Sequence, residues 1–116
     1  MSFYTEKPLI RVMDQIDSVL CPEVMRIDTI ATDFMGDQMV FTRDGDHFSD
    51  DGYFYDELEM IHHRKAQHIC EAIAHNNFCK FEDEAFVCDN SNHDEAVMAL
   101  IQCGTAVGAY IVFGGA

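Results

Sequence analysis

The chain has 116 residues, of which 48% are apolar, and this is the length of one ordinary domain with a substantial core. Seven Lys and Arg residues against 21 Asp and Glu residues give a formal net charge of −14 at pH 7. Such a charge repels nucleic acid and anionic membranes and attracts basic proteins and cations. Direct nucleic-acid binding is therefore disfavoured, and a single domain spanning 1–116 is expected.

The location of the protein is predicted from its segments and cysteines. No run of about 18 apolar residues is evident, so no membrane span is expected. The first residues lack the basic and apolar regions of a secretory signal. Five cysteines, an odd number, lie in apolar segments, which predicts buried free thiols in a reducing compartment. We therefore expect a cytoplasmic protein.

The first half of the chain predicts a helix followed by strands. Apolar residues recur at helical spacing from Pro8 to Leu20, and the helix should end before Cys21-Pro22. Alternating residues then predict a hairpin, with strands at Val24–Phe34 and Gln38–Arg43 around a turn at Gly36-Asp37. A second turn and a short strand at His47–Phe48 follow.

A long helix is predicted from about Asp56 to His75, ending at Asn76-Asn77. Acidic residues occupy its first turn and His75 its last, as the helix dipole favours. Its buried stripe is expected to comprise Leu58, Ile61, Lys65, Ile69, Ala72 and Ile73.

The last third predicts a second hairpin, a helix and a strand. Phe78–Phe81 and Ala85–Cys88 are short apolar segments around a polar turn. A helix from His93 to Cys103 should end at Gly104, and Ala106–Phe113 alternates like a well-covered strand. The order α-β-β-α-β-β-α-β predicts an α+β two-layer sandwich, in which helices cover one face of an antiparallel or mixed sheet of about four to five strands.

One acidic stretch, from Asp28 to Glu59, dominates the charge pattern. Its only cation is Arg43. Aromatic residues are interspersed with the acids, which a disordered acidic tail would lack, so a folded acidic surface is predicted. Its ten carboxylates belong to Asp28, Asp33, Asp37, Asp44, Asp46, Asp50, Asp51, Asp56, Glu57 and Glu59.

A small protein-binding module is the function that this stretch favours, with a basic protein as partner. In its sharpest form the carboxylates replace nucleic-acid phosphates and inhibit a nucleic-acid-binding enzyme. In size, charge and lack of a catalytic motif the chain resembles phage-encoded inhibitors of host restriction or CRISPR systems, a similarity of composition alone. The predicted contact residues are Asp44, Asp46, Asp50, Asp51, Asp56 and Glu57, with Tyr53 and Tyr55 as anchors.

The alternative is a metal-binding domain or metal-dependent enzyme using residues 44–63. Glu59 lies three and four residues before His62 and His63, a spacing that brings ligands onto one helix face. A calcium loop starting at Asp46 has Phe48 at a ligand position and lacks the required glycine at its sixth position. No catalytic residue or cofactor is predicted, and self-association into a homodimer through the final strand is a third reading.

Overall fold

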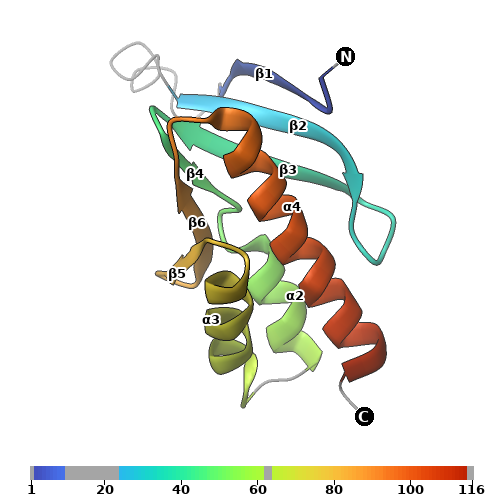
Figure 1. Ribbon diagram of the computed structural model, residues 1–116. Helices are drawn as coiled ribbons and strands as arrows, with labels where there is room; N and C mark the ends of the chain where they lie inside the picture. The colour runs from blue at the N-terminus through green and yellow to red at the C-terminus, as the bar shows by residue number, and fades with distance from the viewer. Residues whose placement is uncertain (1, 10–23, 62–63, 115–116) are drawn as a thin grey trace.

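The computed structural model describes residues 2–9, 24–61 and 64–114, and in these it forms one antiparallel sheet covered by helices. The sheet order is β1-β2-β3-β4-β6-β5, and every neighbouring pair is antiparallel. Figure 1 shows the helices gathered on one face of the sheet. The predicted α+β two-layer class is thus confirmed, with six described strands in place of four to five. The strands are β1 Tyr4–Pro8, β2 Val24–Thr32, β3 Gln38–Asp44, β4 His47–Ser49, β5 Lys80–Glu82 and β6 Ala85–Asp89; the helices are α2 Tyr53–Ile61, α3 Ala66–Asn76 and α4 His93–Ala109, with a π-helical turn η2 Tyr110–Gly114.

The β2–β3 hairpin confirms the alternation read from the sequence. Ile27 and Phe41 are paired across the strands and buried against the helices. Thr29 is also buried, and its hydroxyl donates to the Met39 carbonyl at 2.8 Å, so its burial leaves no unpaired donor. The register shifts after Asp28, which marks a bulge in β2.

The β5–β6 hairpin is also confirmed, although it uses unusual turn residues. Asp83 and Glu84 form its two-residue loop, and both have positive φ, 51° and 62°. This is the backbone pattern of a type I′ turn, which matches strand twist and usually takes Asn or Gly. The pairing of Phe81 with Phe86 across the strands supplies aromatic contact beside the turn.

Pro8 corrects the first predicted element. It ends strand β1 and does not begin a helix. β1 is an edge strand, where the missing N–H of proline costs no interior ladder bond. Positions 10–20 of the predicted helix lie outside the described residues.

The long helix predicted from Asp56 to His75 is wrong. α2 already starts at Tyr53 and ends at Ile61, and a turn at Arg64 and Lys65 precedes α3. One straight helix over both would be about 36 Å long, whereas two short helices pack against each other and both contact the sheet. The predicted stop at Asn76-Asn77 is confirmed.

The predicted buried stripe is confirmed only in part. Leu58 is buried, and Ile69 and Ile73 are half-buried against the core. Ile61 is 54% exposed, and Lys65 and Ala72 are exposed, so these three were predicted wrongly. In α3 the buried positions are Ala66, Cys70 and Ala74, which face the core at a spacing of four residues. Small residues at these positions allow α3 to approach its neighbours closely.

The predicted final strand is wrong as well, because α4 continues through Gly104. A Cβ at Gly104 would lie 2.3 Å from Cζ of Phe54, so this glycine provides space for a buried ring and does not end the helix. Beyond it, Val107 and Gly108 are buried at a helical spacing of four residues from Cys103 and Gly104. The helix start at His93 is confirmed, with the Asn92 side chain accepting from the Glu95 N–H at 3.2 Å.

α4 and η2 run on as one 22-residue helix, His93–Gly114, which is long and apolar enough to cross a membrane by length and composition alone, with a mean hydropathy of 1.9. Half of that apolar window is buried inside the molecule. A core helix that covers a sheet passes the same test of length and composition.

The core lies between the sheet and these helices, and four phenylalanine rings fill its centre. Phe54 of α2 makes edge-to-face contacts with Phe41 of β3 and Phe86 of β6, with ring centroids 6.0 Å apart in both pairs. Phe48 of β4 is fully buried beside them. The packing fixes α2 over the middle of the sheet, and with it the acidic residues of its first turns.

Candidate partner-binding surface

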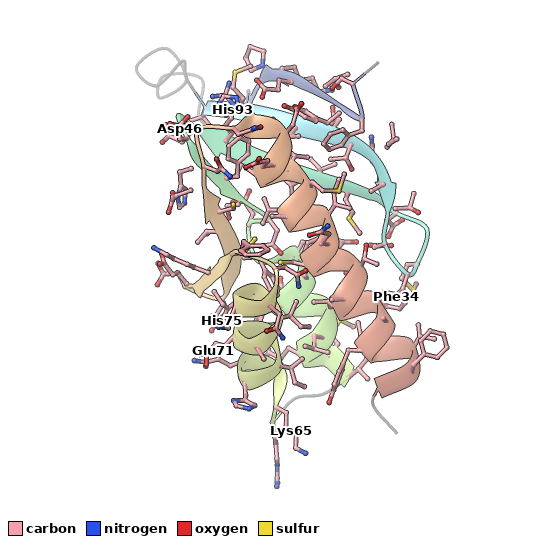
Figure 2. The ribbon with its side chains drawn as sticks, in the orientation of Figure 1. Phe34, Asp46, Lys65, Glu71, His75 and His93 are labelled. Atoms are coloured by element: carbon pink, nitrogen blue, oxygen red, sulfur yellow. The ribbon has the colours of Figure 1, made fainter. Side chains whose placement is uncertain are left out.

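The fold divides the acidic stretch into separate groups. Asp33 and Asp37 lie in the turn between β2 and β3, whereas Asp44 and Asp46 lie at the other end of β3. Seven residues of strand separate the two ends by roughly 20 Å. In Figure 2, Phe34 in the first turn and Asp46 in the second are far apart. The predicted single acidic surface is therefore not formed.

At the β2–β3 turn the fold assembles four residues, Asp33, Asp37, Tyr53 and Glu57, which we call the tip cluster. The Tyr53 hydroxyl of α2 donates to Asp33 Oδ2 at 3.1 Å and to Asp37 Oδ2 at 3.4 Å. Asp33 Oδ1 accepts from the backbone N–H groups of Met35 and Asp37, both at 2.9 Å. These bonds fix the turn against α2.

Crowding of negative charge in the tip cluster has an electrostatic consequence. Loss of hydration, together with the charges of Asp33 and Asp37 and a hydrogen bond to Asp33, raises the pKa of Glu57 to about 7. Burial and the same aspartates, with Glu57, also raise the pKa of Tyr53. Among the described residues, no cation contributes to either shift. The cluster therefore holds carboxylates together without an internal counter-charge.

The acidic group at the β3–β4 turn is different because basic residues, Arg43 and His93, lie beside it. Arg43 makes a two-point ion pair with Glu6, at 2.8 and 3.2 Å. His93 Nε2 lies 3.2 Å from Asp46 Oδ1, and Figure 2 shows both at the start of α4. Asp44 is exposed beside them. Arg43 is thus paired with Glu6 of β1 and not with the carboxylates of the turn, of which Asp46 contacts the His93 ring.

Asp28 is the carboxylate of the stretch that two cations contact, on the face of the sheet away from the helices. Lys7 Nζ and Arg26 Nε contact its two carboxylate oxygens at 2.9 and 2.8 Å. Burial by itself would raise the pKa of Asp28, but these two hydrogen-bonded cations outweigh it and lower the pKa.

Asp50 and Tyr55 must be removed from the predicted contact residues, because both are buried. Asp50 is 3% exposed, and its carboxylate accepts backbone N–H bonds from Gly52, Phe54 and Phe86, each at 2.9 Å. Burial raises the pKa of Asp50, and these three donors oppose the rise. Its role is to cap α2 and tie that helix to β6.

Tyr55 is 9% exposed and packs on Phe81 of β5, with ring centroids 5.4 Å apart. Tyr55 can be buried although residues close to it in the sequence are exposed, because consecutive side chains on a helix point about 100° apart. Of the three consecutive aromatics, Tyr53 is the exposed one, at 43%. Of the two predicted anchors, Tyr53 is therefore accessible beside the acidic residues and Tyr55 is not.

The remaining predicted contact residues are accessible but lie apart. Asp51 and Asp56 are exposed, before and within the first turn of α2. Asp51 lies 3.5 Å from the hydroxyl of Thr42 on β3. Only Tyr53 and Glu57 of the predicted set belong to the tip cluster. Asp33 and Asp37 belong to the acidic stretch but not to the predicted contact residues, and their position on either side of the turn is the only signal for them in the sequence.

The metal alternative gains no support from the described residues. Among them, no group of three or more His, Cys, Asp or Glu side chains has an arrangement that could hold a metal ion. Glu59 is half-buried on α2, while His62 and His63 lie outside the described residues. The described cysteines, Cys70, Cys79, Cys88 and Cys103, are buried as expected, and Cys21 lies outside the described range.

The fold and the tip cluster together define a small, strongly acidic α+β protein with an unbalanced carboxylate group beside an exposed tyrosine. Comparisons of the chain with protein-family models, with curated proteins and with solved structures found no match. The functional argument therefore rests on the geometry of this chain.

Proposed function

We propose that the protein is a binding module that docks on a basic partner protein through the tip cluster. The observation that carries this proposal is the crowding at Glu57, whose pKa of about 7 reflects burial and two nearby aspartates without a described cation. Keeping like charges together lowers stability, and such arrangements concentrate at functional sites. Arg or Lys side chains of a partner would relieve the repulsion.

The shape of the cluster suits a protein contact. Tyr53 provides an exposed aromatic ring, 43% accessible, beside carboxylates on two elements. Phe34 and Met35 of the same turn are 37% and 68% exposed. An aromatic anchor with apolar neighbours and charges at its rim is typical of interface hot spots.

The sharper form of the proposal is competition with nucleic acid for the partner. The exposed carboxylate of Asp37 and the half-buried one of Glu57 would occupy sites that otherwise bind phosphates, with the protein inhibiting a nucleic-acid-binding enzyme. Asp33 is only 9% exposed, and its role is to hold the turn behind them. The acidic group at the β3–β4 turn is left out of this interface, because it lies at the other end of β3 from the tip cluster. A cytoplasmic location belongs to the same proposal and is supported by the buried thiols of the described cysteines.

The test is affinity capture from a lysate of the protein's native cells, with quantitative mass spectrometry. The wild-type chain is compared with the double variant Asp37→Asn/Glu57→Gln, which neutralises the cluster while keeping Tyr53 and Asp33. The matched control, Glu71→Gln/Asp83→Asn, removes two exposed charges elsewhere. We expect a basic partner that wild type and control retain and the cluster variant loses.

Two further measurements on the captured complex decide between outcomes. Raising NaCl from 0.1 to 0.5 M should release the partner, since screening weakens exposed charge pairs. Added duplex DNA should displace the protein from its partner if the two compete for the same site on that partner. Capture that is unchanged by salt and by the cluster variant would contradict the proposed interface.

A further inference from the structure

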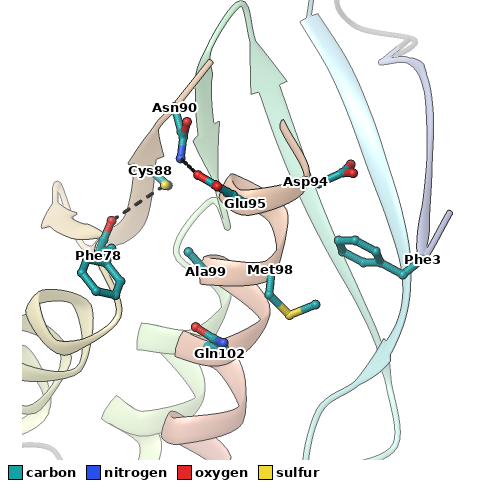
Figure 3. A pocket seen from close by; sticks show the side chains of 9 residues that line it. All are labelled: Phe3, Phe78, Cys88, Asn90, Asp94, Glu95, Met98, Ala99 and Gln102. Carbon is teal, nitrogen blue, oxygen red and sulfur yellow. Dashed lines mark hydrogen bonds between the residues drawn. The ribbon is translucent and has the colours of Figure 1, made fainter. Parts of the chain in front are cut away.

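A groove of about 650 Å³ crosses the exposed side of α4, and it lies on a different part of the molecule from the tip cluster. Phe3, which precedes β1, and Phe78, which connects α3 to β5, stand on either side of it in Figure 3. Met98 and Ala99 of α4 provide an apolar surface between them. A concave, mostly apolar site with a few polar groups is the usual form of a ligand pocket.

Phe78 is the least expected residue of this groove. Its side chain is 90% exposed and its φ is +62°, a conformation that bulky residues rarely adopt. It occupies the position just after the C-cap of α3, and the next residue, Cys79, donates its N–H to the Ala74 carbonyl at 2.9 Å. This is the Schellman motif, in which glycine is the usual residue at the Phe78 position.

An exposed phenylalanine at a glycine position costs stability twice, through its backbone and through an apolar ring left in water. The fold gains no core contact from that ring. Such a cost in stability is expected where the side chain contacts a ligand or a partner. The Phe78 ring lines the groove, where it is accessible to one.

The polar groups of the groove select a cation. Asp94 and Glu95 line it from the first turn of α4, where the helix dipole favours negative charge. Their present partners are neutral donors: the Tyr4 hydroxyl at 2.9 Å from Asp94 and the Asn90 amide at 3.3 Å from Glu95. Among the described residues that line the groove, none is Lys, Arg or His.

We propose that this groove binds an arginine-containing peptide segment of a partner protein, with the guanidinium stacked on Phe78 and hydrogen-bonded to Glu95 or Asp94. Arginine fits better than lysine because its planar head both stacks on aromatic rings and donates to carboxylates in a fork. The volume exceeds one side chain, so an apolar neighbour of the arginine would pack on Met98 and Phe3. The groove and the tip cluster are separate sites, and either could bind without the other.

The probe is an acetylated and amidated Gly-Leu-Arg-Leu-Gly peptide, titrated into the full chain and followed by NMR through the Met98 methyl and backbone amide signals. A matched peptide carries citrulline, which keeps the shape of arginine without its charge. The test variant is Phe78→Gly, which suits the backbone at that position and should fold at least as well as wild type. Phe113→Ala is the control, because Phe113 is also exposed, at 80%, but lies on η2.

We expect shifts confined to residues of the groove, with affinity reduced at least about fivefold by Phe78→Gly and about tenfold by citrulline. Phe113→Ala should leave the affinity within about twofold of wild type. Shifts at Tyr53 and Glu57 alone would overturn the groove and favour the tip cluster as the only basic-partner site. Equal affinity for the citrulline peptide would overturn the proposal that the groove selects a cation. NMR signals of groove residues that shift with protein concentration in the absence of peptide would identify a second copy of the chain as the occupant.

Discussion

Glu57 is the residue at which carboxylate crowding can be measured most directly. Its pKa of about 7 in the fold, against an ordinary value of 4.5, means that folding takes up a proton between these pH values. The free energy of unfolding should therefore decline as pH rises from about 4.5 to 7, with the full penalty above that range. Glu57→Gln should remove this decline and raise stability at pH 8 by about 1 kcal/mol, a figure reduced for solvent screening because the group is only partly buried.

Urea unfolding of both proteins at pH 5 and pH 8 checks this prediction. Glu71→Gln is the control, because Glu71 is exposed on α3 and its nearest partner is the neutral Gln67 amide at 3.1 Å. The control should follow the wild-type pH dependence. If the Glu57 variant loses stability at pH 8 instead, its carboxylate takes part in a stabilising contact.

Asp50 presents the opposite case, because its carboxylate stabilises the fold by accepting hydrogen bonds from buried donors. Three backbone N–H groups, from Gly52, Phe54 and Phe86, point at its two oxygens in the interior. In Asp50→Asn the amide nitrogen cannot accept, and at least one of these donors loses its partner. We predict a loss of about 3 kcal/mol in the free energy of unfolding.

Chemical denaturation of Asp50→Asn at pH 7 measures this loss. Asp51→Asn, one position along and exposed, should change stability by less than about 0.5 kcal/mol. A similar small effect at Asp50 would mean that the three donors find other acceptors.

At the scale of elements, the two glycines of α4 test how the helix approaches its neighbours. Gly104→Ala would place Cβ 2.3 and 2.7 Å from two atoms of the Phe54 ring and 2.9 Å from Met39 Cε, all in the core. Overpacking of about 2–3 kcal/mol should exceed the gain of about 1 kcal/mol in helix propensity. The variant should therefore unfold at a lower temperature than wild type.

Gly108→Ala is the matched helix position with a softer neighbour. Its nearest contact would be Phe34 Cβ at 3.2 Å, in a turn where Phe34 is 37% exposed and can give way. We expect this variant to be neutral or slightly more stable by thermal unfolding. Equal destabilisation by both substitutions would show that backbone flexibility in α4, and not the Phe54 contact, is the reason for the glycines.

For the whole molecule, a net charge of −14 on one small domain predicts self-repulsion that salt should relieve. The electrostatic screening length is about 10 Å at 0.1 M NaCl and becomes shorter at 0.5 M. This increase in NaCl should therefore raise the melting temperature by about 4 °C. Asp37→Asn/Glu57→Gln should show a smaller rise, because it removes two of the negative charges that repel one another in the tip cluster. Differential scanning calorimetry provides the comparison, and a melting temperature that falls with NaCl would indicate that attractive ion pairs such as Arg43–Glu6 dominate instead.

Local patterns in the sequence were sufficient to predict several structural elements of this protein. The turns at Gly36 and Asp83, the alternation of Ile27 and Phe41 and the cap at Asn92 each depend on neighbours along the chain, so both hairpins and the start of α4 followed from them. The acidity and the α+β class depend on composition and element order, and were predicted for the same reason.

Other features were decided only by contacts between distant residues. Gly104 resembles a helix stop until Phe54 is seen against it, and an apolar segment such as Val107–Phe113 reads equally as a strand or as a buried helix. Asp50 resembles its exposed neighbours until Phe86, 36 positions away, is found donating to it. The tip cluster joins a turn to a helix through Tyr53 and Asp33, 20 positions apart. Burial, hydrogen bonding and charge crowding are properties of the packed chain, and linear spacing carries no record of them.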